Sequence, residues 1–290
     1  MGGRLVILAG GISSRMRQPT LKSAGLDARL IEDAKDKAKS MIGVGRNYRP
    51  FLDYLLFNAR EAGYKDVVMV VSEKDDSIRN YYGTKDRGND FHGLAVSYAV
   101  QKIPPGRIKP PGTADALLQA LKIRGDWQGK KFTVCNSDNL YSQKALRLLL
   151  HSTYPNAMID YDRSTLQFEE SRIQDFAVTE KDDDNFLVNI IEKPSWEDIE
   201  LVKSENGVIG VSMNIFQFDY DMILPFLERI PLHPVRLEKE LPSAVVMMLA
   251  AYPKSVYAFP LCEHVPDLTN RVDILSVKDY LDKFQNFVFE

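Results

Sequence analysis

The first candidate ligand-binding residues follow a short apolar segment near the start of the chain. Residues 5–16 read LVILAGGISSRM, in which the apolar run leads into Gly10 and Gly11 and then to Arg15. Glycine lets backbone N–H groups approach an anion closely, and a guanidinium can donate two hydrogen bonds to phosphate oxygens. The order predicts a phosphate-binding loop, although a tight turn with a surface arginine explains the same residues equally well. The third glycine of a dinucleotide fingerprint and the Gly-Lys-Ser/Thr of a P-loop are both missing.

A second segment places glycine immediately before a helical pattern. In PPGTADALLQAL, residues 110–121, Thr113 is a plausible helix N-cap and Gly112 precedes it. Such a glycine can bring the backbone close to a base or ribose. Taken alone, a well-capped helix is the better explanation of this segment.

A third segment ends an apolar strand in polar side chains. In KFTVCNSDNLYS, residues 131–142, the strand leads to Asn136, Asp138 and Asn139. A carboxylate at a strand end of an α/β sheet can bind Mg²⁺ together with substrate phosphates, so Asp138 is the best candidate metal ligand. An Asx turn that closes the strand explains these residues about as well.

Two downstream segments carry further charged residues. In IIEKPSW, Glu192 can accept hydrogen bonds from sugar hydroxyls and Lys193 can neutralise a phosphate, whereas an exposed turn is the simpler explanation. In VPDLTNRVDI, Asp267 could supply a second carboxylate to the metal, whereas Asp267 or Asp273 could instead cap the last helix.

Other common catalytic arrangements are not indicated. The histidines are scattered without metal-ligand spacing, and no Ser-His-Asp arrangement can be identified. Cys135 lies inside an apolar strand, which favours a small core residue over a nucleophile. With Cys262 it makes 2 cysteines, too few for a disulfide framework or a metal knuckle, and we expect a reducing, cytoplasmic setting.

Strands and helices that alternate along the chain must position these residues. Alternation predicts an α/β, Rossmann-like fold with a mostly parallel central sheet, helices on both faces and a ligand site at the carboxyl ends of the strands. The charged stretch 27–39 is expected to be an inserted helix or lid. Strands are expected at 5–9, 67–71, 131–135, 157–161, 186–191, 208–218 and 256–259. Helices are expected from 51 until Gly63 stops the pattern, and at 114–121, 143–150, 220–229, 239–251 and 272–284.

Composition limits the classes of partner. The chain has 290 residues, of which 44% are hydrophobic and 27% charged, as in an ordinary globular protein. Its net charge of −3 provides no general field for nucleic acid, and its apolar runs are too short to span a membrane. We expect one domain over 1–290, with a nucleotide-binding part at about 1–150 and the remainder at about 151–290.

In this order, the motifs resemble the sugar-phosphate nucleotidyltransferases, also called nucleoside-diphosphate-sugar pyrophosphorylases. LAGGISSRM is similar to the glycine-rich signature of that family, GTADALLQA to its Gly-Thr-Ala helix start, and CNSDN to its metal-binding strand end. IIEKP, VSMNIFQF and VPDLTNRVD are similar to later motifs, and the pattern looks closest to a poorly characterised bacterial branch. The resemblance implies the GT-A-like nucleotidyltransferase fold.

The resemblance also implies roles for individual residues. Ala9, Gly10, Gly11, Gly112 and Thr113 would bind the nucleotide, and Glu192, Lys193 and Asn214 the sugar phosphate; Asn214 stands where many members have glycine. Asp138 and Asp267 would bind Mg²⁺, and the catalytic set would be Arg15, Lys39, Asp138 and Lys193, with Lys22 as the rival of Lys39.

The implied reaction is the Mg²⁺-assisted joining of a nucleoside triphosphate to a sugar 1-phosphate. The acceptor phosphate would attack the α-phosphorus in line and expel pyrophosphate, so positioning and electrostatics carry the catalysis. The opening motif also resembles molybdenum-cofactor guanylyltransferases and methylerythritol-phosphate cytidylyltransferases, so a non-sugar phosphate is an alternative acceptor. A catalytically silent nucleotide-binding protein is a second alternative. Neither the base, the acceptor nor the oligomeric state follows from the sequence.

Overall fold

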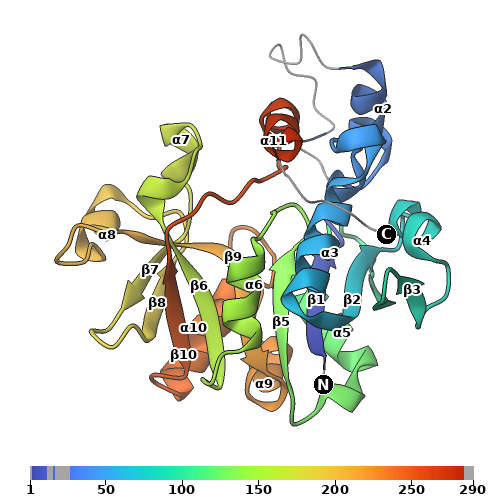
Figure 1. Ribbon diagram of the computed structural model, residues 1–290. Helices are drawn as coiled ribbons and strands as arrows, with labels where there is room; N and C mark the ends of the chain where they lie inside the picture. The colour runs from blue at the N-terminus through green and yellow to red at the C-terminus, as the bar shows by residue number, and fades with distance from the viewer. Residues whose placement is uncertain (1, 12–15, 17–26, 284–290) are drawn as a thin grey trace.

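A mixed β-sheet runs through the centre of the protein and carries helices on both faces (Figure 1). The structure is a computed structural model that describes residues 2–11, 16 and 27–283. The strand order is β10-β6-β9-β5-β1-β2-β4-β3, and β7 joins β9 and β8 at one side. The strands are β1 (Gly3–Ala9), β2 (Tyr64–Ser72), β3 (Asn89–Phe91), β4 (Leu94–Gln101), β5 (Lys131–Asn136), β6 (Asn156–Asp162), β7 (Val178–Lys181), β8 (Leu187–Ile191), β9 (Gly210–Asp219) and β10 (Val256–Leu261).

The centre of the sheet is parallel, as the alternation of strands and helices predicts. β5, β1, β2 and β4 run in one direction, and β6 and β10 pair parallel to each other. β9 lies between β5 and β6 and runs antiparallel to both, which makes the sheet mixed. The predicted α/β fold with a largely parallel core is therefore confirmed, with one antiparallel strand inserted.

Helices cover both faces of this sheet. They are α2 (Ala28–Asp36), α3 (Phe51–Ala62), α4 (Ser77–Tyr82), α5 (Thr113–Ile123), α6 (Gln143–Leu150), α7 (Glu170–Ile173), α8 (Trp196–Leu201), α9 (Tyr220–Arg229), α10 (Leu241–Ala251) and α11 (Asp273–Asp282). α3 and α6 contribute to one hydrophobic core, and α5, α9 and α10 to the other. Leu5 and Ile7 of β1 face the first core and Val6 faces the second, because side chains alternate along a strand.

Sequence periodicity found most elements but missed several. α6 and α9 have the predicted bounds, and α5 is slightly longer than expected. β4, with the sequence LAVSYAVQ, was not predicted, because its alanines and its serine weaken the β signal. Four-residue β7 was missed as well, although β7 and β8 form the hairpin that carries the Glu-Lys-Pro segment.

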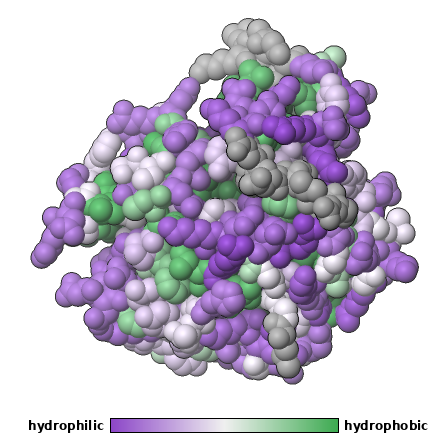
Figure 2. Space-filling view, in the orientation of Figure 1, coloured by the Kyte–Doolittle hydropathy of each residue, from purple (hydrophilic) through white to green (hydrophobic). Residues whose placement is uncertain are grey.

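The charged stretch, expected to form a helix or lid, contains the helix α2. One face of this helix is buried against the protein. Leu30, Asp33 and Ala34 are buried, and Asp33 accepts a hydrogen bond from the backbone of Gly43. α2 lies near α11 at one end of the molecule (Figure 1). The face of the protein that is turned to the viewer in Figure 1 is mainly hydrophilic, with small hydrophobic patches (Figure 2). Among the described helices, none combines the length and apolar character needed to cross a membrane.

Candidate active site

A cavity of about 270 Å³ lies at the carboxyl ends of the central parallel strands. Ala9 ends β1 and Gly10 follows it, Gln101 ends β4 and Asn136 ends β5, and all four line the cavity. This is the edge at which parallel α/β sheets bind ligands. The predicted segments around Gly10, Gly112 and Asp138 are therefore brought to one cavity, which is also lined by Leu8, Gly11, Ala38, Lys39, Ser40, Lys109, Pro110, Thr113, Ala116, Ser137 and Glu238.

The start of α5 forms one wall of this cavity. Gly112 is the N-cap residue with φ 115°, and an added Cβ would lie 2.5 Å from the carbonyl oxygen of Lys239, so only glycine fits there. Thr113, expected as the cap, is instead the first helical residue, and its Oγ1 accepts a hydrogen bond from the Leu241 amide at 2.9 Å. Gln101 donates from Nε2 to the Gly112 carbonyl at 2.8 Å, which joins the end of β4 to this wall.

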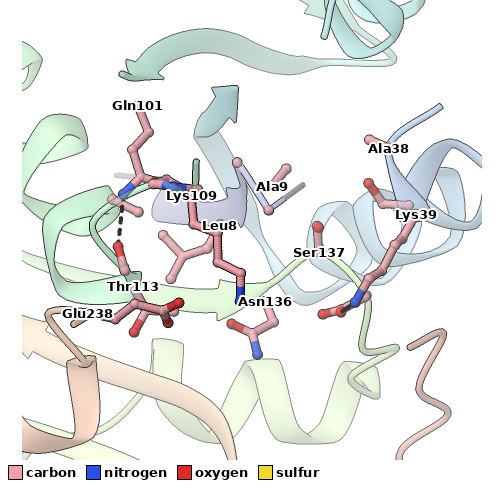
Figure 3. Close-up of a pocket in the computed structure, with 17 residues that line it drawn as sticks. Leu8, Ala9, Ala38, Lys39, Gln101, Lys109, Thr113, Asn136, Ser137 and Glu238 are labelled. Carbon is pink, nitrogen blue, oxygen red and sulfur yellow. Dashed lines mark hydrogen bonds and ion pairs between the residues drawn. The ribbon is translucent and has the colours of Figure 1, made fainter. Parts of the chain in front are cut away.

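Lysine side chains approach the cavity from opposite sides. Figure 3 shows Lys109 on the side of Gln101 and Thr113, and Lys39 on the side of Ala38 and Ser137. Lys39 Nζ lies 3.1 Å from Asp138 Oδ2, so it is placed to contact an anion bound beside that carboxylate. Of the two lysines considered from the sequence, Lys39 is in the cavity, whereas Lys22 lies outside the described residues. Arg15 also lies outside them.

A second, larger cavity adjoins the first at Asn136 and Asp138, which line both. Its volume is about 910 Å³. Lys193 from the end of the β7–β8 hairpin and Asn214 from β9 line it, as does Asp267. Three of the residues predicted for the acceptor and metal are thus brought together, and Asp138 stands where the two cavities meet.

Backbone pairing holds Asp138 and Asp267 next to each other. The Leu268 amide donates to the Asp138 carbonyl at 2.8 Å, and the Leu140 amide donates to the Pro266 carbonyl at 2.9 Å. Burial and then the negative charge of Asp138 raise the pKa of Asp267 above its ordinary value. Mg²⁺ in proteins is usually bound by one or two carboxylates, and phosphates and water fill its other positions. Asp138 and Asp267 border the same cavity and could provide these carboxylates.

Arg172 from α7 provides a cation beside Asp267. Its Nη2 lies 3.1 Å from Asp267 Oδ1, and its Nη1 lies 2.6 Å from Asp273 Oδ1. Asp273 also accepts hydrogen bonds from the Thr269 and Asn270 amides, so it fixes the turn before α11. The helix cap considered for Asp267 or Asp273 is not formed, because Val272 is the N-cap residue of α11 and no described side chain caps this helix. The residues fit the predicted Mg²⁺, because Asp138 and Asp267 both border the second cavity. Within the described ranges, no group of three or more His, Cys, Asp or Glu residues is placed to hold a metal ion.

Asn214 occupies a left-handed position within a strand. Its φ is 55°, and the pairing of β9 with β6 shifts register in this region. Asparagine adopts this conformation more readily than most other residues, which explains how it replaces the glycine typical of the resembled family. The bulge turns Asn214 toward the second cavity, which it lines.

Glu192 is not among the residues that line either cavity. Its Oε2 lies 3.4 Å from Arg236 Nη1, and Arg236 also pairs with Glu240. The predicted contact between Glu192 and a sugar stays a prediction.

Some residues that line the cavities were not singled out from the sequence; they are Lys109, Gln101, Glu238 and Arg172. Lys109 and Glu238 line the same cavity because the end of loop 102–112 packs on residues 239–241, and no local pattern signals that packing.

Comparison with known families identifies the class of protein. Residues 4–259 match the family model described as nucleotidyl transferase, and the chain belongs to this family. The chain is 24% identical over 211 residues to a glucose-1-phosphate adenylyltransferase of Koribacter versatilis (strain Ellin345), covering 71% of this chain and 49% of that protein. It is 25% identical over 173 residues to the protein of the same name from Corynebacterium jeikeium (strain K411), covering 60% and 42%. The chain thus spans about half the length of the curated relatives it matches.

Solved structures share the fold over nearly the whole chain. The UTP-bound UGPase from Acinetobacter baumannii superposes with a TM-score of 0.70 at 17% identity, covering 98% of this chain and 95% of that one. A UDP-glucose pyrophosphorylase complexed with UDP-glucose gives a TM-score of 0.68 at 14% identity, covering 98% and 99%. The predicted nucleotidyltransferase fold is confirmed. The boundary expected near residue 150 and the residue roles stay predictions.

Proposed function

We propose that this protein is a sugar-1-phosphate nucleotidyltransferase, which converts a nucleoside triphosphate and a sugar 1-phosphate into a nucleoside-diphosphate sugar and pyrophosphate. The observation that carries the proposal is the pair of adjoining cavities that share Asn136 and Asp138. Two substrates between which a nucleotidyl group is transferred need neighbouring sites with the reacting atoms at the junction. The names of the relatives, which include glucose-1-phosphate adenylyltransferases, support the same class of reaction.

The first cavity would hold the nucleoside triphosphate. Gly10 and Gly11 present the backbone at the end of β1, and Gly112 and Thr113 form the wall opposite Lys39. Lys39 and Lys109 would neutralise phosphate oxygens from the two sides of the cavity. Arg15 is proposed to contribute to the same phosphates.

The second cavity would hold the acceptor. Lys193 and Asn214 border it, and Lys193 would offset the charge of the acceptor phosphate. Asp138 and Asp267 would hold Mg²⁺, which when bound stabilises negative charge on the transferring phosphate. An oxygen of the acceptor phosphate would form a bond to the α-phosphorus, and the bond from that phosphorus to the bridging oxygen of pyrophosphate would break.

This chain's residues would assist without forming a covalent intermediate. A phosphate monoester is already an anionic nucleophile, so no general base is needed, and the residues act by alignment and charge. Lys39 would stay close to Asp138 at the junction and limit the repulsion between two anionic substrates. This accounts for a site rich in lysine and aspartate.

Thermal melting of the purified protein with ATP, GTP, CTP, UTP and dTTP, each with and without Mg²⁺, tests the nucleotide half of the proposal. A ligand that binds only the folded state raises the melting temperature. We expect a Mg²⁺-dependent rise with at least one triphosphate and a smaller rise in Lys39→Gln. No shift with any triphosphate at millimolar concentration would contradict the proposal.

A pyrophosphate-release screen then tests the acceptor half. The triphosphate that binds is combined with a panel of sugar 1-phosphates and, in parallel, with non-sugar phosphate monoesters. Release that requires a sugar 1-phosphate supports the proposal, and release only with a non-sugar phosphate would reassign the acceptor. Binding without release from any acceptor would favour a catalytically silent nucleotide-binding protein.

A further inference from the structure

A third cavity lies on the outer side of α6, away from the residues placed in the active site. It has a volume of about 430 Å³ and is lined by residues of α6, the turn after it and Phe259 of β10. That volume is within the range of sites for small organic ligands. It shares no lining residue with either cavity of the candidate active site. We call it the α6 groove, and its lining residues are Lys144, Arg147, Leu148, His151, Ser152, Thr153, Tyr154 and Phe259.

Basic side chains form the rim of the α6 groove, and none of its lining residues is acidic. Lys144, Arg147 and His151 follow one another at helical spacing and are exposed. In the described part of the chain none of them forms an ion pair, and Arg147 donates only to the Glu61 carbonyl and the Gln143 side chain. Glu263, which feels the positive charge of Lys144, accepts a hydrogen bond from the Ser142 hydroxyl and lies outside the lining.

The dipole of α6 does not account for all of these basic residues. Basic residues near the C-terminus of a helix complement its dipole, which accounts for His151 at the C-cap of α6. Lys144 is the second residue of α6, where a positive charge is unfavourable to the dipole. The helix dipole therefore does not account for the lysine at this position.

The floor of the α6 groove is aromatic. Tyr154 stacks on Tyr257, with ring centroids 4.0 Å apart and planes at 6°, and Phe259 packs edge-on against both rings. Such a cluster offers a flat, rigid surface for another ring. Beside it, the Ser152 hydroxyl is buried without a hydrogen-bond partner in the described structure, so one polar atom in the wall is left for a ligand or a water molecule.

From this combination we infer that the α6 groove is a second ligand site, which binds a small phosphorylated compound with an aromatic ring. The basic side chains would contact the phosphate, the Tyr154 and Phe259 edge would contact the ring, and the Ser152 hydroxyl would hydrogen-bond to the ligand. The site is separate from the catalytic cavities and requires neither the nucleotide nor the acceptor to be bound.

Calorimetric titration with phenyl phosphate tests this site. We expect saturable binding that is weakened about threefold in Lys144→Gln and about tenfold or more in the Lys144→Gln/Arg147→Gln double variant, since charge-assisted contacts are lost. Inorganic phosphate should bind more weakly than phenyl phosphate, because it cannot contact the aromatic floor. Melting temperatures of the variants should stay within about 2 °C of the unmodified protein, because these are exposed surface residues.

Matched variants separate this site from the active site. Lys122→Gln changes another exposed helical lysine, and Lys39→Gln changes the catalytic cavity, so neither should alter the affinity for phenyl phosphate. Equal affinity in the double variant and the unmodified protein would overturn the proposal. So would a loss of affinity in Lys39→Gln, equal binding of inorganic phosphate, or no saturable binding at millimolar concentration.

Discussion

Asp138 is the residue on which the account of the site depends most. It lies at the end of β5, borders both cavities and pairs with Lys39 at 3.1 Å. Replacement by asparagine keeps the shape of the side chain but removes the charge that would bind the metal and position Lys39. We expect Asp138→Asn to lower turnover by about 100-fold or more, as for other groups that stabilise transition-state charge, while the protein stays folded.

Pyrophosphate release, with the melting temperature as the check on folding, measures this effect. Asp90→Asn is the matched control, because Asp90 is exposed on β3, far along the sheet from β5. It should leave turnover unchanged. Turnover of Asp138→Asn within a factor of two or three of the unmodified enzyme would remove Asp138 from the metal site.

His264 gives the stability of the protein a specific pH dependence. Its Nδ1 accepts a hydrogen bond from the Gln167 amide at 3.1 Å, and its ring packs on Phe168. Burial, followed by the positive charge of Arg172, lowers the pKa of His264 from 6.5 to about 4. Between these values the unfolded chain binds a proton that the folded chain does not, so the free energy of unfolding falls as the pH falls from about 6.5 to about 4.

The loss assigned to His264 is about 1–2 kcal/mol after allowance for its partial exposure. Urea unfolding at pH 7, 6, 5 and 4 should show a shallower decline in His264→Gln than in the unmodified protein. His151→Gln, at an exposed position, should keep the original decline. If all three proteins lose stability in parallel, His264 is not the group responsible.

At the scale of residues, the sequence was informative where a candidate site residue lies immediately before or after a regular helix or strand. Asp138 was singled out because a polar residue follows an apolar strand, and Gly112 because it precedes a helical pattern; the structure places both in the lining of the first cavity. Lys109 and Glu238 were not found, because each depends on how two long loops pack against each other. The charge of Glu192 predicted a ligand contact, but Arg236, distant in sequence, provides its ion pair in the structure.

At the scale of elements, the start of α5 shows how a local conformation builds a wall of the first cavity. Gly112 combines a φ of 115° with close contact to the Lys239 backbone. Gly112→Ala should therefore reduce the free energy of unfolding by about 2–4 kcal/mol, through backbone strain and displacement of the 237–241 segment. It should also weaken triphosphate binding, because Thr113 shares this wall.

Gly106→Ala in the preceding loop is the control for strain alone. Gly106 has a φ of 80°, but an added Cβ would have no atom within 4 Å. Its replacement should cost about 1 kcal/mol and leave triphosphate affinity unchanged. Urea unfolding and a titration with the triphosphate that binds measure both quantities. Equal losses in the two variants would show that contact with Lys239 does not matter.

The same scale explains which elements could be predicted. β1, β2 and β5 are buried on both faces and appear as continuous apolar runs, which is the signal of a central parallel strand. β7 is too short to show a period, and the left-handed bulge at Asn214 depends on the pairing of β9 with β6. Strand order, and with it the insertion of β9 between β5 and β6, depends on long-range pairing that local patterns do not encode.

At the scale of the whole molecule, the sheet brings the two cavities to one edge, where Asp138 borders both. β1, β4, β5 and α5 form the first cavity, and β9, α7 and the turn before α11 border the second. The C-terminal half therefore completes a site that the N-terminal strands begin. This arrangement predicts that both substrates are bound together before the transfer takes place.

Transfer of a label from the α-phosphate of the bound triphosphate tests the central claim most directly. The protein is incubated with Mg²⁺, a sugar 1-phosphate and the triphosphate labelled at its α-phosphorus, and the products are separated. The account predicts label in a nucleoside-diphosphate sugar, one unlabelled pyrophosphate per molecule formed, and no product from Asp138→Asn. Label that stays in the triphosphate, or appears in free nucleoside monophosphate whether or not the sugar phosphate is present, would contradict it.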